Sequence, residues 1–179
     1  MKIFFGVILI LIGYVYSQEM HNSLFLLIGG GIGGWLIWQP IGNSLKDASK
    51  KKEWLGLAEG CQYQHYHKST GIGMNTATRQ VYLFDGDKFK RYDFTDIRNW
   101  SYSVLTGGTT MSNRTLAEGA HNSRQNKENE AGSGLFLDVK DIDHPEWRVA
   151  FPWHATNNRK TEVELKRWME IFQQNINEK

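Results

Sequence analysis

An uncharged, glycine-rich run at residues 24–38 constrains this chain more than any other feature of its sequence. It follows a second uncharged run at residues 3–17, and only six residues connect the two. An α-helix needs about 20 apolar residues to cross a bilayer, so both runs lie near the short limit. Tyrosines near the end of the first run and tryptophans near the end of the second are typical of membrane interfaces. We therefore predict a two-helix transmembrane hairpin at residues 1–40.

The glycines of the second run admit two interpretations. Gly29, Gly31 and Gly34 satisfy GxGxxG, the fingerprint of a dinucleotide-binding unit. That unit requires an amphipathic helix after the glycines, then a second strand, and an acidic residue about 20 residues on. Here the glycines are followed by the uniformly apolar WLIW, and no second strand follows at the required place. The other interpretation is close packing of membrane helices through small residues four apart, Gly29 with Gly33 and Gly30 with Gly34. We favour packing, which also predicts self-association of the chain through this helix.

The lysines predict the orientation of the hairpin. The connection between the two runs has no Lys or Arg, whereas Lys2 precedes the first run and a lysine cluster follows the second. Basic residues gather on the cytoplasmic side, so both ends should face the cytoplasm at a bacterial inner membrane. A signal peptide cleaved after Ser17 is the alternative, and it would leave the C-terminal part on the same side.

The segment at residues 41–57 is predicted to be a basic linker next to the membrane. Pro40 and Gly42 should end the membrane helix, and a new, short helix can start after them. The linker carries four lysines that can meet anionic lipid headgroups: Lys46, Lys50, Lys51 and Lys52. A cluster that only sets the topology on a solvated face is the simpler interpretation of the same residues.

Residues 58–179 are enough for one domain with a core of its own. The formal net charge of +2 gives no basic face for nucleic acid, so we expect no nucleic-acid partner. The single cysteine, Cys61, excludes a disulfide within the chain and suits a reducing compartment.

The sequence pattern changes to a period of two after the linker. Alternation predicts strands at residues 61–67, 72–74, 80–85, 88–94, 99–105, 135–139 and 147–151. The Asp85-Gly86-Asp87 turn is the strongest hairpin signal in the chain. Strands at this spacing predict a small antiparallel barrel or sandwich.

An amphipathic helix should close the domain. Thr161 and Glu164 have the spacing of a capping box. Apolar residues recur after them at helical spacing: Leu165, Trp168, Met169, Phe172 and Ile176. The predicted fold of residues 58–179 is therefore α+β, with this helix packed on the strands.

Residues 107–133 differ from the rest of the domain. They are polar and small, with only Met111 and Leu116 as large apolar side chains. A loop this long in a compact domain is functional or disordered, and we predict a mobile insertion. The candidate partner-binding residues within it are Met111, Arg114, Leu116 and Arg124.

The order of these segments carries a resemblance to a known kind of domain. It rests on GIGMN, RQVYLFDGDKFKRYDFTDIRNW and the ending WRVAFPW…ELKRWMEIF, and covers about residues 57–176. In these segments the chain resembles an uncharacterised bacterial family of small membrane-anchored proteins with a cytoplasmic pleckstrin-homology-like (PH-like) domain. The resemblance implies a non-enzymatic binding module with no catalytic residues to carry over. It also suggests an immunity, exclusion or defence accessory role.

One pattern suggests a metal. Cys61, His65 and His67 form C-x3-H-x-H, half of a conceivable zinc site, with His144 or His154 as a further ligand. A hydrogen-bonded face of aromatic residues is the simpler interpretation, and we expect no metal, no cofactor and no enzymatic activity. The expected function is recognition of a protein partner at the inner face of the membrane, and the alternative is binding of anionic lipid.

Overall fold

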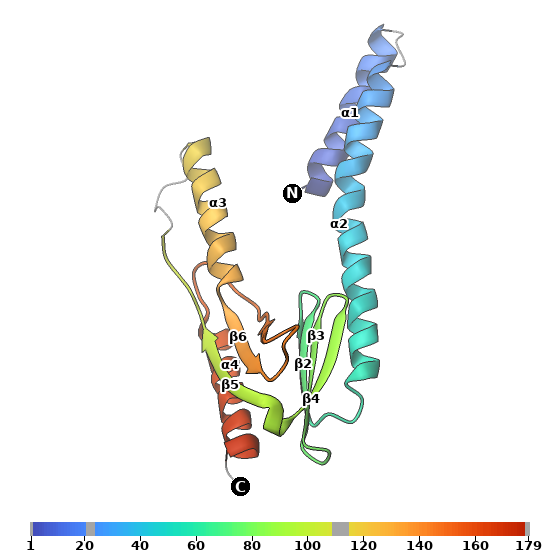
Figure 1. Cartoon of the computed structure of the whole chain (residues 1–179). Coiled ribbons are helices and arrows are strands. Elements are labelled where there is room, and N and C mark those ends of the chain that lie inside the picture. Colours follow the sequence, from blue (N-terminus) through green and yellow to red (C-terminus); the bar gives the residue numbers. More distant parts are fainter. Residues whose placement is uncertain (1, 21–23, 109–114, 178–179) are drawn as a thin grey trace. The chain divides into compact units, whose positions relative to one another are not determined.

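The computed structural model describes residues 2–20, 24–108 and 115–177 (Figure 1). The chain divides into two compact units, one ending at Lys50 and the other beginning at Lys51.

The first unit is helical. Helix α1 spans Lys2–Met20, and helix α2 spans Leu24–Leu57 and so continues into the second unit. The two helices approach backbone to backbone, because a Cβ added at Gly33 would lie 2.6 Å from the carbonyl oxygen of Gly6. One added at Gly29 would lie 2.7 Å from the carbonyl oxygen of Leu9. In the described part of the chain, no helix is long and apolar enough to cross a membrane.

Helix α2 does not end where the sequence predicts. Its 34 residues run through Pro40 and Gly42 without a break, so the predicted end of the helix at these residues is wrong. A proline removes one backbone donor and disturbs one turn, and the hydrogen bonds on either side of it are enough to continue a long helix.

The second unit contains two antiparallel sheets. The first has the order β1-β2-β3-β4, formed by Tyr63–His67, Thr70–Asn75, Gln80–Asp85 and Lys88–Asp93. A short 3-10 helix, η1 at Phe94–Asp96, leads to the second sheet. That sheet has the order β5-β6-β7, formed by Ile97–Ser103, Gly134–Val139 and Glu146–Val149. The predicted α+β class with antiparallel strands is confirmed, and each strand lies within a few residues of its predicted position.

The main core lies between the two sheets and helix α4, which spans Arg159–Phe172. The side chains that are at most 1% exposed come from all three layers: Ile72, Met74, Leu83, Leu135, Leu137, Leu165 and Phe172. Burying a side chain of this size contributes roughly 1.5–3 kcal/mol, so this cluster accounts for much of the stability of the unit. The predicted apolar face of α4 is the face that packs here.

A second, smaller cluster covers another part of the first sheet. Trp54, near the end of α2, is 1% exposed and packs with Ala58, Cys61 and Phe84. Its ring lies against β2 at Gly71, where an added Cβ would be 2.8 Å from a ring atom. The last turns of α2 therefore belong to the fold of the second unit.

The start of α4 also differs from the prediction. Its N-cap is Asn158, and Thr161 lies inside the first turn, where its hydroxyl donates to the carbonyl oxygen of Pro152. The predicted capping box of Thr161 and Glu164 is therefore wrong. The side chain of Asn158 hydrogen-bonds the backbone of His154 instead of capping the helix. A π-helical turn, η2 at Gln173–Asn177, follows α4.

Part of the predicted insertion is a helix. Helix α3 spans Leu116–Ala131, where the sequence suggested a loop without regular structure. It begins with a capping box formed by Thr115 and Glu118. Pairs four residues apart support it, including Arg124 with Glu128. These local interactions let a helix form without an apolar face.

Candidate functional site

Strand β1 lies at the end of the first sheet, and within the described residues it pairs only with β2. The β1–β2 turn consists of Lys68 and Ser69, whose φ angles are 47° and 59°. A two-residue turn of this kind closes on a hydrogen-bonded pair, here His67 with Thr70. Alternation along the ladder then directs the backbone N–H and C=O of Gln64 away from β2. This edge can accept a further strand.

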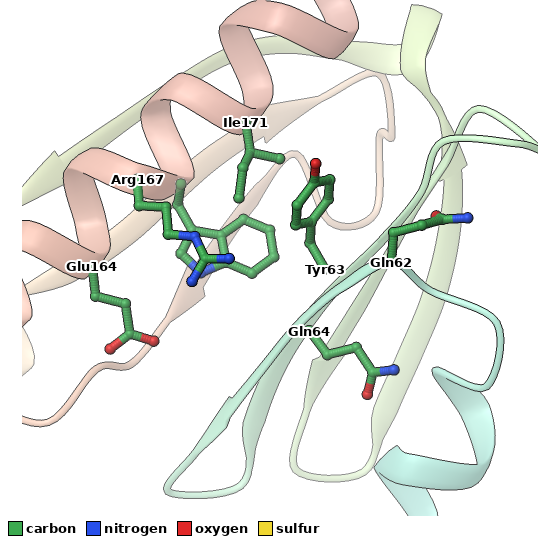
Figure 2. Close-up of a pocket in the computed structure, with 7 residues that line it drawn as sticks. Gln62, Tyr63, Gln64, Glu164, Arg167 and Ile171 are labelled. Atoms are coloured by element: carbon green, nitrogen blue, oxygen red, sulfur yellow. The ribbon is translucent and has the colours of Figure 1, made fainter.

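A cleft of about 170 Å³ runs between this edge and helix α4 (Figure 2). β1 and the residue before it contribute Gln62, Tyr63 and Gln64. The helix contributes Glu164, Arg167, Trp168 and Ile171, which recur at intervals of three and four residues on one face.

The cleft has an apolar floor and a polar rim. Trp168 and Ile171 are 4% and 7% exposed, and Tyr63 packs against the main core from β1. Figure 2 shows the Tyr63 ring directed toward Ile171, with Arg167 and Glu164 further along the helix. Among the described lining residues, one guanidinium and one carboxylate give the rim little net charge, so the cleft suits a segment without net charge.

His65, whose side chain is 8% exposed, supports one wall of the cleft. His65 Nδ1 lies 2.9 Å from Glu164 Oε1, and Nε2 lies 3.0 Å from the carbonyl oxygen of Ala150. The ring stacks on Phe151 with centroids 3.7 Å apart. Both facing oxygens are acceptors, so a ring nitrogen that bears a hydrogen donates to the oxygen that it faces. His65 thus ties β1 to α4 and orients the Glu164 carboxylate beside the cleft.

A second polar network fixes the β6–β7 turn. Lys90 Nζ lies 2.5 Å and the Tyr92 hydroxyl 2.7 Å from Asp141 Oδ2, and both donate to it. These hydrogen bonds hold the pKa of Asp141 well below its ordinary value. Burial and the Asp141 hydrogen bond raise the pKa of Tyr92. Trp147 Nε1 donates to the same hydroxyl at 3.1 Å, so this network stabilises the turn.

The residues of the suggested zinc half-site are not brought together. Cys61 precedes β1 and lies in the smaller cluster with Trp54, whereas His65 faces Phe151 and Glu164. In the described ranges, no group of three or more His, Cys, Asp or Glu is arranged to hold a metal ion. Burial raises the pKa of the Cys61 thiol, which disfavours the reactive thiolate.

The predicted lipid and partner residues lie on the surface where the structure describes them. Lys46, Lys51 and Lys52 are exposed on α2, and Lys50 is half-buried. Leu116 is 96% exposed at the start of α3. Arg124 pairs with Glu128 at 2.9 Å. Met111 and Arg114 lie outside the described residues. Binding by any of them stays a prediction.

The predicted glycine seam divides into two groups. Gly29 and Gly33 pack against α1, whereas a Cβ at Gly30 or Gly34 would meet no heavy atom of the described residues within 4 Å. The first pair is used within the chain. Self-association through this helix stays a prediction, and Gly30 and Gly34 are the pair that it would use.

Sequence reasoning missed the cleft as a site. The helical stripe predicted Trp168 as core, and the alternation predicted β1 as a strand. Neither pattern indicates that β1 stands at a sheet edge or that α4 lies beside it. Gln62, Gln64 and Arg167 carry no motif that marks them.

Residues 62–179 match a family described as "Domain of unknown function (DUF4755)". No curated protein and no solved structure matches the chain. The matched residues include β1, α4 and every residue that lines the cleft between them.

Proposed function

The chain belongs to the DUF4755 family, and we propose that it is a membrane-tethered, non-enzymatic binding module that recognises a protein partner at the inner face of a bacterial membrane. The cleft between β1 and α4 is the proposed binding site. An extended segment of the partner would add to β1 as a further strand and place one side chain on Trp168 and Ile171.

The outer edge of β1 next to the cleft is the observation that carries this proposal. Strand addition supplies backbone hydrogen bonds that do not depend on the partner's sequence, and a pocket beside the edge supplies selectivity. The outward N–H and C=O of Gln64 support the first contribution. The floor of Trp168 and Ile171 supports the second, because aromatic residues in desolvated pockets dominate binding energy.

Exposed apolar side chains support the membrane tether. Phe4, Leu11, Trp35 and Trp38 on α1 and α2 are each more than half exposed. An apolar surface of this extent is unfavourable in water and requires a cover. We propose that lipid provides it, with the hairpin of residues 1–40 in the bilayer and residues 58–179 in the cytoplasm.

We further infer that residues 58–179 form a PH-like domain. A four-stranded and a three-stranded antiparallel sheet, followed by one amphipathic C-terminal helix, support this inference.

A pull-down of the full chain from its native membrane, in a mild detergent, tests the proposal. In Gln64→Pro the proline lacks the outward N–H and obstructs an added strand, while the β1–β2 hydrogen bonds stay. Gln64→Ala is the matched control, because it changes the same side chain and keeps the N–H. We expect one stoichiometric partner that is retained by Gln64→Ala and lost by Gln64→Pro. Equal retention by both variants would contradict binding at the β1 edge.

Anionic-lipid binding is the second candidate function. The exposed ammonium groups of Lys46, Lys51 and Lys52 on α2 support it, at roughly 1 kcal/mol for each basic residue near an anionic surface. Co-purification of anionic lipid without any protein partner would favour this function over the first.

A further inference from the structure

A second cleft, of about 430 Å³, lies between helix α3 and Trp153. Trp153 follows β7, and its indole Nε1 donates to the carbonyl oxygen of Leu105 at 2.9 Å, which fixes the plane of the ring. The opposite wall is one face of α3 at intervals of three and four residues: Gly119, Asn122, Ser123, Asn126, Lys127 and Glu130.

Helix α3 is held in place at its C-terminal end. The Arg148 guanidinium donates to the carbonyl oxygens of Glu130 and Ser133, at 2.6 and 2.7 Å. The Asn129 amide donates to the carbonyl oxygen of Gly107 at 2.8 Å. The cleft therefore has two walls whose positions are set by hydrogen bonds.

The helix wall contains a polar group without a partner. The side-chain oxygen of Asn126 is buried and accepts no hydrogen bond from the described residues. A buried acceptor without a partner is costly, which favours a conformer of the amide in which the oxygen meets a donor. Rotation of the amide exchanges its oxygen and nitrogen at little steric cost, so either group can face the cleft. Asn122, which is 8% exposed, lies one turn away on the same face.

We propose that this cleft binds a neutral sugar ring. A pyranose has one face of C–H groups, which packs on an indole, and a rim of hydroxyls, which donate to and accept from amides. Trp153 supplies the indole, and Asn126 and Ser123 supply the polar contacts.

The other side chains that line the cleft disfavour other ligands. Within the described part of the chain they include no aliphatic residue, so the side chains of a peptide would gain no apolar contact from them beyond the indole. Among the described lining residues, Lys127 carries the one ammonium and Glu130 the one carboxylate, which pairs with Lys68 outside the cleft, so a phosphate or nucleotide would meet a single lysine and no arginine.

Saturation-transfer NMR on the full chain in phospholipid nanodiscs tests the proposal. The probes are glucose, N-acetylglucosamine, cellobiose and chitobiose at millimolar concentration, and detergents with sugar headgroups are avoided. We expect transfer to the ring protons of at least one probe. Trp153→Ala should weaken its binding by roughly tenfold or more, and Asn126→Leu should weaken it severalfold.

Two further variants keep the test independent of folding. Trp153→Phe keeps an aromatic face and should retain binding. Ala120→Ser changes α3 at an exposed side chain outside the cleft and should bind as the unchanged chain does. No transfer to any of the four sugars, or equal transfer in Trp153→Ala and the unchanged chain, would overturn the proposal.

Discussion

Trp54 offers the strongest test of how the second unit is built. Its side chain is 1% exposed and packs on Phe84, with ring centroids 6.0 Å apart. Truncation of a buried tryptophan to alanine costs about 3–5 kcal/mol, because the transfer energy is lost and a cavity remains. Gly71 has no side chain to fill that cavity. We expect Trp54→Ala to remove a large share of a stability that is about 5–15 kcal/mol in an ordinary domain.

Hydrogen exchange of the β2 and β3 amides, followed by mass spectrometry of the full chain in nanodiscs, measures this loss. Protection should fall by roughly two to four orders of magnitude where exchange requires unfolding of the domain. Trp38→Ala is the matched control, since Trp38 lies on the same helix and is 70% exposed. A loss below about 1 kcal/mol in Trp54→Ala, or an equal loss in the control, would refute the reasoning.

Three further predictions concern charge, helix packing and helix capping. The fold depresses the pKa of Asp141, so the ionised side chain stabilises the fold above its ordinary pKa of about 4, and this stabilisation is lost as the pH falls. In Asp141→Asn, the temperature midpoint of unfolding should therefore change less as the pH is lowered. Gly33→Leu should separate α1 from α2, whereas Gly30→Leu should be tolerated, as measured by cross-linking between introduced cysteines; equal yields in both variants would contradict the seam. Thr115→Ala removes the capping hydroxyl of α3 and should cost about 1 kcal/mol, seen as faster amide exchange in its first turn and unchanged exchange in α4.

The strands of both sheets are predictable because their alternation reflects burial on one face. Val81 and Leu83, for example, are fully buried, and Tyr82 between them is not. The Asp85-Gly86-Asp87 turn is predictable for a different reason, the backbone freedom of glycine. Gly86 has a φ of 63°, in the region that glycine adopts at little cost.

The errors have local physical causes. Helix α3 buries no large apolar residue, so hydrophobic periodicity has nothing to detect, although Thr115 and Glu118 form a capping box. Thr161 and Glu164 have the same spacing inside a helix that starts earlier, which shows that the motif alone does not locate an N-terminus. Pro40 does not end α2, because a proline removes only one backbone donor from a long helix.

The candidate site could not be predicted because it depends on long-range packing. Gln64 and Glu164 are 100 positions apart in the sequence, and their proximity depends on how α4 packs beside β1. The link from His65 to Glu164 likewise joins two elements that no local pattern relates. Sequence periodicity predicts which face of each element is buried, and the sheet order determines which edge remains open.

Site-specific photo-cross-linking tests the central claim, that the β1 edge receives a segment of a protein partner. A photoreactive amino acid replaces Gln64 at the cleft in the full chain in intact cells, and in a control it replaces the exposed Thr78 in the β2–β3 turn. The account predicts an adduct with one protein from position 64 alone, with the cross-link in one extended segment of that protein. Adducts with lipid only, or the same protein adduct from both positions, would contradict it.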